Sequence, residues 1–512
     1  MLFGASIIVA FLLSPVIVRE LGNHNYGLWE TIQALTGFLG ILEIGIGPAV
    51  SRYVAVYHAS NNRDSVLKVL NSSLAVLSVT GFACFLCVLI LSFFSSYILG
   101  VPDVQIYRKG MLFLLSGFGL LLAFPGTALV GFVLGMQRHY VLNTTRTITT
   151  ILAGIGCYFA MMQAGDSRLL WMVLIGIVTS CFHYATFAAI ILLHEPRAFG
   201  VRHVSFSVIR ELYLFGAKSL VMNAAVSIFT RSMSIVISHT VGISSVVFFA
   251  IPKRLFEYAE GLTVTLGYPL TPFFASMSGR DSQSTLRTAW LNTSRALQFF
   301  ALGFAVAMAF LGEPFLHRWM GPSYAANGRY VVWILSFSLF LNGIACNSNR
   351  LLVSTGTHGR AGIGALLLVF PVLCITVVLA FLWGVSGIAV GVMLFSSGNS
   401  GIQLAFALRQ LDLKVSEFIR QTTGSYALPL AALAIVLAAG RQYTYPGSYL
   451  HLLGLGSLSA IVYAVFAWTF SLNREERGSF TAIIRSGGLF RSLMGSSVKR
   501  SADTRGPFPA KE

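Results

Sequence analysis

Residues 361–383 read AGIGALLLVFPVLCITVVLAFLW, and residues 384–408 continue as GVSGIAVGVMLFSSGNSGIQLAFAL. No charged side chain occurs between Arg360 and Arg409. A helix needs about 20 mostly apolar residues to cross the hydrocarbon core of a bilayer. The run therefore predicts two consecutive membrane-spanning helices.

Similar apolar stretches recur from one end of the chain to the other and predict about fourteen spans in all. The loops between them are short, so we expect no separate extramembrane domain. The predicted spans are residues 1–18, 27–50, 69–99, 110–135, 144–164, 168–193, 211–240, 243–275, 288–312, 328–353, 361–383, 384–408, 424–440 and 449–471.

The composition supports the same fold class. The chain has 512 residues, of which 55% are hydrophobic and 10% are charged, whereas soluble domains carry about 25% charged residues. So little charge cannot cover a surface that faces water, so lipid must face most of it. The sequence therefore predicts an all-α polytopic membrane protein.

The net charge of +17 does not indicate a nucleic-acid partner. The basic residues occur singly in loops and in the C-terminal tail, without a nucleic-acid-binding motif. Membrane topology and anionic lipid headgroups explain them better.

The cysteines do not indicate a metal site or a soluble cofactor. Cys84 and Cys87 have CxxC spacing, but no second pair and no nearby histidine completes a zinc site. All six cysteines lie in apolar segments: Cys84, Cys87, Cys157, Cys181, Cys346 and Cys374.

The distribution of Lys and Arg predicts the orientation of the chain. These residues are more frequent in the loops after even-numbered spans than in those after odd-numbered spans. Because positively charged loops stay in the cytoplasm, the even loops and both termini are expected there. The basic tail after the last span agrees with this orientation.

The chain also shows an internal repeat with an offset of about 220 residues. The matching loop positions are Gly22 and Gly242, Arg63 and Arg280, and Gly135 and Gly356. Six spans per repeat give both copies the same orientation, which implies two six-helix lobes related by an axis along the membrane normal. The predicted parts are an N-terminal lobe (1–194), a cytoplasmic linker (195–210), a C-terminal lobe (211–409), two additional helices (410–471) and a basic tail (472–512).

Charged and polar residues within the spans are the candidate functional residues, because a charge at membrane depth costs a few kcal/mol. They gather in the first, second, seventh and eighth spans. Guanidinium groups bind phosphate oxygens in pairs, so the predicted pyrophosphate and sugar contacts are Arg19, Arg52, Asn223, Arg231, Lys253 and Arg254. The candidates for coupling to a cation or proton are Glu43, Glu257 and Glu260.

Each of these residues also has a structural interpretation. Arg19 and Arg52 could be interfacial anchors that extend toward the headgroups. Lys253 and Glu257 are four residues apart on one helix and could form an ion pair, which would leave Arg254 as an uncompensated positive charge. The glutamates could simply form hydrogen bonds between helices.

The N-terminal stretch carries a family resemblance. It reads Arg19-Glu20-Leu21-Gly22, then Tyr26-Gly27-Leu28-Trp29, Gly45-Ile46-Gly47 and Ser51-Arg52-Tyr53. These residues resemble the polysaccharide transporter family, which includes the Wzx-type flippases of O-antigen and capsule repeat units. The family belongs to the multidrug/oligosaccharidyl-lipid/polysaccharide exporter superfamily.

The resemblance implies two lobes around a central cavity that opens alternately to each side of a bacterial cytoplasmic membrane. It implies that the first, second, seventh and eighth spans line this cavity. The implied substrate is a polyprenyl-pyrophosphate-linked oligosaccharide, moved from the cytoplasmic to the outer leaflet, with the polysaccharide polymerase machinery as a partner.

Three other functions compete with this interpretation. A multidrug cation antiporter of the same superfamily would favour an acidic cavity, whereas the predicted one is cationic. A lipid II flippase is a close alternative. A polysaccharide polymerase or ligase would be an enzyme, but it would need a larger outer loop than this chain has, so a non-enzymatic transporter is expected.

Overall fold

A computed structural model describes residues 2–43, 45–95, 106–163, 167–196, 198–278, 283–444, 448–471 and 477. Within these ranges every regular element is a helix. Eleven helical stretches are long and apolar enough to cross a membrane. Two of them, Gly4–Ala59 and Asn223–Met277, each overlap two of the predicted spans. The chain is therefore an all-α polytopic membrane protein, as predicted; the predicted tail at 472–512 lies almost wholly outside the described residues.

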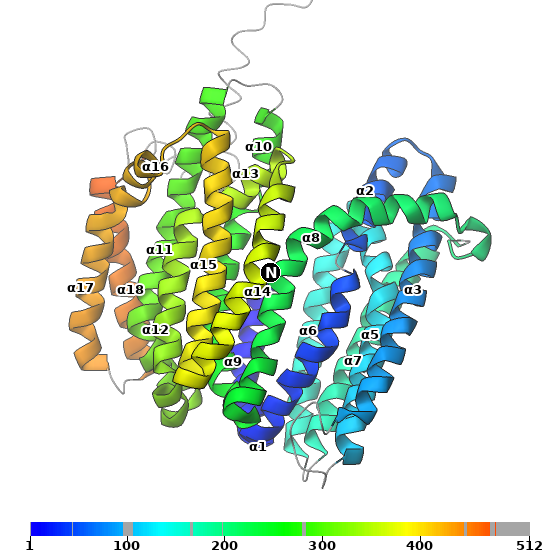
Figure 1. Cartoon of the computed structure of the whole chain (residues 1–512), viewed down its shortest axis with the longest axis horizontal. Coiled ribbons are helices and arrows are strands. Elements are labelled where there is room, and N and C mark those ends of the chain that lie inside the picture. The colour runs from blue at the N-terminus through cyan, green and yellow to red at the C-terminus, as the bar shows by residue number, and fades with distance from the viewer. Residues whose placement is uncertain are drawn as a thin grey trace, which may run out of the picture.

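The first group of helices corresponds to the first six predicted spans, and Figure 1 shows it on the right. It comprises α1 (Leu2–Leu39), η1 (Gly40–Glu43), α2 (Ile46–Ala59), α3 (Arg63–Phe93), α5 (Ile106–Gly135), α6 (His139–Met162) and α7 (Arg168–His194). Helix α6 is not among the eleven apolar stretches, because its first half carries Arg146 and several threonines.

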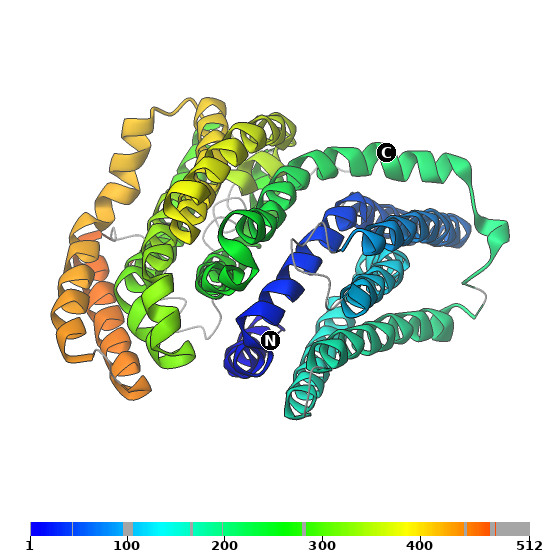
Figure 2. The same ribbon diagram turned by 60° about the horizontal axis from the view of Figure 1, so that its bottom comes forward.

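The second group stands beside the first, and α17 and α18 lie along its far edge (Figures 1 and 2). Its elements are α8 (Phe206–Ile237), η4 (Ser238–Gly242), η5 (Ile243–Ser245), α9 (Val246–Gly267), α10 (Leu270–Ser278), α11 (Gln283–Met320), α12 (Pro322–Ala345), α13 (Ser348–Ser354), α14 (His358–Trp383) and α15 (Val385–Gln410). The remaining elements are η3 (Val201–His203) in the linker, and α16 (Val415–Gln421), η6 (Thr423–Tyr426), α17 (Ala427–Thr444), α18 (Tyr449–Phe466) and η7 (Ala467–Ser471) after α15.

The first predicted turn is tighter than the sequence suggested. The sequence predicts a loop between residues 18 and 27, but α1 runs through this region and is interrupted at a single residue, Gly22 (φ 74°, ψ 163°). Gly242, its counterpart in the predicted repeat, also has a positive φ of 112°. Only glycine adopts such backbone angles without strain, so one residue is enough to turn each helix.

Helix α8 belongs to both groups. In its first half, Leu212 is buried in a cluster with Val54, Leu67 and Leu70 of α2 and α3. In its second half, Phe229 and Met233 are buried with α9, α12 and α14. Figures 1 and 2 show the first half running across the ends of the first group before α8 turns along the second group.

Helix α1 connects the groups at the opposite end. Val18 and Tyr26 lie in the same buried cluster as α8, α9 and α11, although α1 also packs against α6. We call this end, where α1 turns at Gly22, the Gly22 end. We call the end that carries residues 195–205, which join α7 to α8, the linker end.

Replacement of Gly22 should destabilise the fold through its backbone angles alone. A Cβ at Gly22 would meet no atom within 4 Å, and the same holds for Gly119 inside α5. Gly22→Ala should cost about 1–3 kcal/mol of stability, because alanine is strained in this conformation. Gly119→Ala has helical backbone angles and should leave the melting temperature unchanged or raise it. Equal melting temperatures for the two purified variants would contradict this account of the turn.

Candidate functional site

Arg254 of α9 reaches across to the first group of helices. Its guanidinium lies 3.1 Å from Glu30 Oε1 and donates a hydrogen bond of 3.1 Å to Ser14 Oγ, both on α1. Tyr26 donates its hydroxyl to the same Glu30 oxygen at 2.9 Å. The Arg254 guanidinium also lies 5.8 Å from the centre of the Tyr26 ring. One arginine thus joins two segments of α1, on either side of Gly22, to the second group.

The expectation that Arg254 is an uncompensated charge is therefore wrong. Sequence reasoning considered partners within the same helix, but the partner is Glu30, more than 200 residues earlier in the chain. The predicted pair of Lys253 and Glu257 does form, with Nζ 2.6 Å from Oε1. Lys253 and Arg254, two adjacent cations of α9, therefore both have carboxylate partners in this conformation.

Two further hydrogen bonds join the groups at the Gly22 end. Trp319 Nε1 of α11 donates to the backbone oxygen of Phe11 at 2.7 Å, and Tyr324 of α12 donates its hydroxyl to Asn23 Oδ1 at 2.6 Å. These contacts lie at the same end as the turn at Gly22. Together with Arg254, they close the groups against each other there.

Arg231 of α8 is in a different position from Arg254. Its guanidinium lies directly against Gly37 of α1, where a Cβ would overlap it. Among the described residues, no carboxylate or other side chain pairs with it. Arg231 is half-buried in the interface between α1 and α8. A guanidinium has five N–H donors, and charge-assisted hydrogen bonds to an anion are the strongest that it forms.

The other predicted contacts are spread along the helices rather than gathered at one point. Asn223 is exposed on α8, about two turns before Arg231. Arg19 is exposed on α1, three residues before Gly22. Arg52 is exposed near the linker end of α2, where its guanidinium lies 4.5 Å from the centre of the Phe215 ring. Arg19 and Arg52 therefore lie toward opposite ends of the helices.

The glutamates predicted to couple to a cation occupy three different settings. Glu43 is half-buried at the end of η1 and accepts a hydrogen bond from the Thr127 hydroxyl of α5. Glu257 is exposed and held by Lys253. Glu260 is half-buried about one turn further along α9 and makes no side-chain hydrogen bond within the described part of the chain.

The predicted site residues do not include Tyr26, Glu30, Gly37 or Thr127, each of which contacts one of them. Tyr26 and Glu30 are four residues apart and so share a helix face, which is a signal that could have linked them. Gly37 and Thr127 carry no such signal, because their roles depend on which helix packs against them.

Comparison with known proteins places this arrangement in a family. The pattern of the family described as "Polysaccharide biosynthesis protein" matches residues 1–278, more than half of the chain. The chain belongs to this family. The matched residues include every predicted site residue, from Arg19 on α1 to Glu260 on α9.

One relative and two solved structures show the breadth of this similarity. A Shigella flexneri protein named "Putative O-antigen transporter" is 22% identical over 354 residues, which cover 67% of this chain and 81% of the relative. The lipid II flippase MurJ, in an inward closed conformation, superposes with a TM-score of 0.69 at 13% identity over 90% of this chain and 96% of that one. An inward-facing multidrug resistance transporter of the MATE family superposes with a TM-score of 0.67 at 12% identity, over 80% and 94% of the two chains.

The resemblance seen in the N-terminal motifs is thus confirmed, and the fold is that of the MATE and MurJ transporters. This member of the polysaccharide biosynthesis family is a multi-pass membrane protein with bacterial homologues, and it shares its fold with transporters.

Removal of one partner of the Arg254–Glu30 pair should destabilise the protein far more than removal of one partner of the Lys253–Glu257 pair. Glu30→Gln leaves a guanidinium in the interface without its carboxylate, which should cost about 2 kcal/mol. Glu257→Gln removes a pair within one helix whose glutamate is exposed, which should cost about 0.5 kcal/mol at most. Thermal unfolding of both purified variants measures the difference. Equal losses would show that the contact between the groups adds no more stability than the pair within α9.

Proposed function

We propose that this protein moves polyprenyl-pyrophosphate-linked oligosaccharide repeat units from the cytoplasmic to the outer leaflet during polysaccharide biosynthesis. The observation that carries the proposal is Arg231, a half-buried guanidinium against Gly37 with no acidic partner among the described residues. The name of the Shigella flexneri relative supports an O-antigen unit as the cargo. The likeness to MurJ supports a fold able to carry such a cargo.

The proposed architecture has two six-helix lobes, residues 1–194 and 211–409, related by a parallel repeat. The matching positive φ angles at Gly22 and Gly242 support this relation. The helices within 410–471 are additional, and both termini are cytoplasmic. Helix α8 modifies the boundary, because its first half packs on the N-terminal lobe.

In the proposed mechanism, the pyrophosphate enters from the linker end and binds Arg231. Asn223 lies about two turns away on the same helix, and we propose that it contacts the sugar. The contacts of Arg254, Trp319 and Tyr324 with α1 close the Gly22 end in this conformation. The pyrophosphate then competes with Glu30 for Arg254, because both are anions that a guanidinium binds through paired hydrogen bonds. Loss of the Glu30 contact weakens the closure, so binding of the cargo favours opening toward the outer leaflet.

Coupling to a cation or proton is proposed to involve Glu43 or Glu260 rather than Glu257. Glu257 is already neutralised by Lys253 at 2.6 Å. Glu43 and Glu260 are half-buried and form no ion pair within the described part of the protein.

The first test is lipid analysis of cells that lack the gene. We expect a complete repeat unit to accumulate on its polyprenyl-pyrophosphate carrier, and the intact gene to relieve this accumulation. Arg231→Gln should fail to relieve it although the variant reaches the membrane. Accumulation of lipid II would identify the alternative flippase. Normal surface polymer with altered resistance to cationic drugs would instead identify an antiporter.

Gly37→Ala should reproduce the Arg231 defect without removing the arginine. The added methyl group would overlap the guanidinium, which is the flexible end of its side chain and would have to swing away. The matched control is Gly40→Ala, whose Cβ would lie in ordinary contact, 3.8 Å from Leu120 Cδ1. We expect a loss of transport of about tenfold or more for Gly37→Ala, which corresponds to about 1.4 kcal/mol, and almost none for Gly40→Ala. Full transport by Gly37→Ala would show that the position of Arg231 is not critical.

Bridging the groups at the Gly22 end should stop transport. Asn23 and Tyr324 are hydrogen-bonded across the interface, so Asn23→Cys with Tyr324→Cys should react with a short, cleavable thiol crosslinker. We expect the bridged protein to be inactive and to recover when the bridge is cleaved, because the proposed cycle requires these helices to separate. The single-cysteine variants, treated identically, control for the native cysteines. A bridged protein that still transports would rule out opening at this end.

A further inference from the structure

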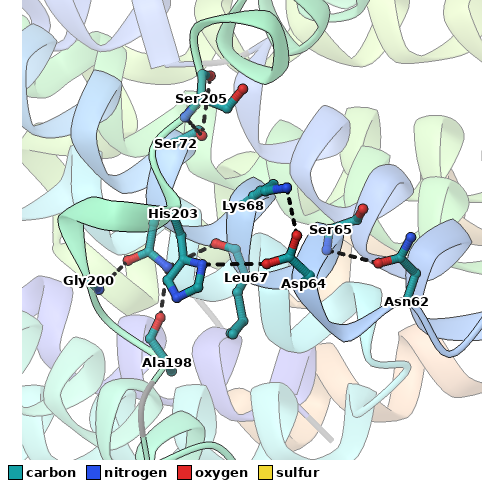
Figure 3. A network of polar contacts seen from close by, with 11 residues as sticks. Asn62, Asp64, Ser65, Leu67, Lys68, Ser72, Ala198, Gly200, His203 and Ser205 are labelled. Carbon is teal, nitrogen blue, oxygen red and sulfur yellow. Dashed lines mark hydrogen bonds and ion pairs between the residues drawn. The ribbon is translucent and has the colours of Figure 1, made fainter.

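The linker before α8 is fixed to α3 by a network of hydrogen bonds (Figure 3). Asn71 donates to the backbone oxygen of Ala198 at 2.7 Å and accepts from the backbone N–H of Gly200 at 2.8 Å. The hydroxyl of Ser72 accepts from the backbone N–H of Ser205 at 2.9 Å. Asn71 and Ser72 are buried, so the linker is an integral part of the first helix group.

The network determines where α8 begins. Ser205 directly precedes the first residue of α8, and its contact with Ser72 holds it beside the third turn of α3. This turn follows the charged residues Arg63, Asp64 and Lys68 at the start of α3. Such a run of charges marks the level of the lipid headgroups.

Residues 206–217 of α8, which we call the α8 surface segment, pack against the protein on one face. Leu212 is fully buried among residues of α2 and α3. The Phe215 ring contacts Tyr53 at a centroid distance of 6.2 Å. Gly216 lies against the backbone of Gly45, with no room for a Cβ on either residue. This face therefore fixes the rotation of the segment about its axis.

The opposite face carries large apolar side chains that nothing in the described chain covers. The exposed fractions are 81% for Phe206, 44% for Tyr213 and 62% for Leu214. Arg210 is exposed between them and makes no ion pair within the described ranges. At 3.6 residues per turn, these four side chains fall on one side of the helix, away from Leu212.

A membrane surface suits this combination better than water does. An exposed aromatic and aliphatic face suits a helix that lies in the interface between headgroups and acyl chains. An arginine within that face can extend its long side chain to the headgroup phosphates. The segment crosses the ends of the first helix group instead of running along them (Figures 1 and 2). Val204 and the exposed Arg202, in the linker beside it, extend the same mixture of apolar and basic groups.

We propose that the α8 surface segment is an interfacial helix that binds anionic phospholipids of the leaflet at the linker end, with Phe206, Tyr213 and Leu214 among the upper acyl chains and Arg210 on a headgroup phosphate. The inference goes beyond the transport function and does not depend on which cargo is carried. It implies that the element shared by both helix groups is held by the lipid as well as by the protein.

The test uses tryptophan fluorescence of the full chain in vesicles of phosphatidylcholine and phosphatidylglycerol in equal amounts. The reporter is Phe206→Trp, and the matched control is Glu211→Trp on the side of the helix that faces away from the acyl chains. The signal of the wild-type tryptophans is subtracted. We expect lipids brominated on their upper acyl chains to quench the tryptophan at position 206 strongly and the one at position 211 weakly. Equal quenching at both positions, or none at 206, would overturn the proposal.

The preference for anionic lipid is measured by brominating one lipid class at a time. Brominated phosphatidylglycerol should quench the 206 reporter more than brominated phosphatidylcholine does. One arginine at the surface should enrich the anionic lipid near the reporter by up to about fivefold. Addition of Arg210→Gln should remove most of this preference while the total quenching persists, because the apolar contacts remain. If the preference is absent, or unchanged by Arg210→Gln, then Arg210 does not bind the headgroup and the anionic-lipid site is refuted. Neither a negative quenching result nor a missing lipid preference would alter the transport assay. Failure of this proposal is therefore distinct from failure of the proposed flippase function.

Discussion

A charge inside a membrane protein is stable only where it meets an opposite charge or a polar ligand, and this constraint organises the centre of the molecule. Arg254 satisfies this constraint through its contacts with Glu30, Ser14 and Tyr26 of α1. The same contacts join the second helix group to the first. An interaction that satisfies one buried guanidinium therefore also determines which end of the protein is closed. If the pair is broken without a substitute, the arginine is left with an energetic penalty of a few kcal/mol.

Arg231 is subject to the same constraint, but no carboxylate in the described part of the chain satisfies it. It lies close to the interface that Arg254 spans, but it rests on the backbone of Gly37 instead of a carboxylate. The absence of a side chain at Gly37 provides room for the guanidinium, and the open hydrogen-bonding positions suit an anionic ligand. Arg231 is therefore available to bind an anionic cargo in the proposed mechanism. Arg254 is already paired, and the same cargo would compete for its contact with the other helix group.

Helix α8 transmits any such response, because its two halves pack on different helix groups. The first half is anchored by the linker contacts of Asn71 and Ser72, and the second half carries Arg231. A relative movement of the groups must therefore bend or tilt α8. Contact of its exposed face with lipid would make the surrounding leaflet part of that movement.

The sequence by itself determined the class of the fold, because the length and apolar character of a membrane span are local properties. The uncharged run at 361–408, the break between the first two spans and the i,i+4 pairing of Lys253 with Glu257 could all be derived from neighbouring residues. The position of the turn, at the single residue Gly22, came from the structure. The partner of Arg254 and the contact of Arg231 with Gly37 could not, because each joins segments about 200 residues apart. The shared role of α8 and the position of its exposed face likewise depended on the packing of whole helices. Only the tertiary structure could show which of the charges are already satisfied and which remain available to a ligand.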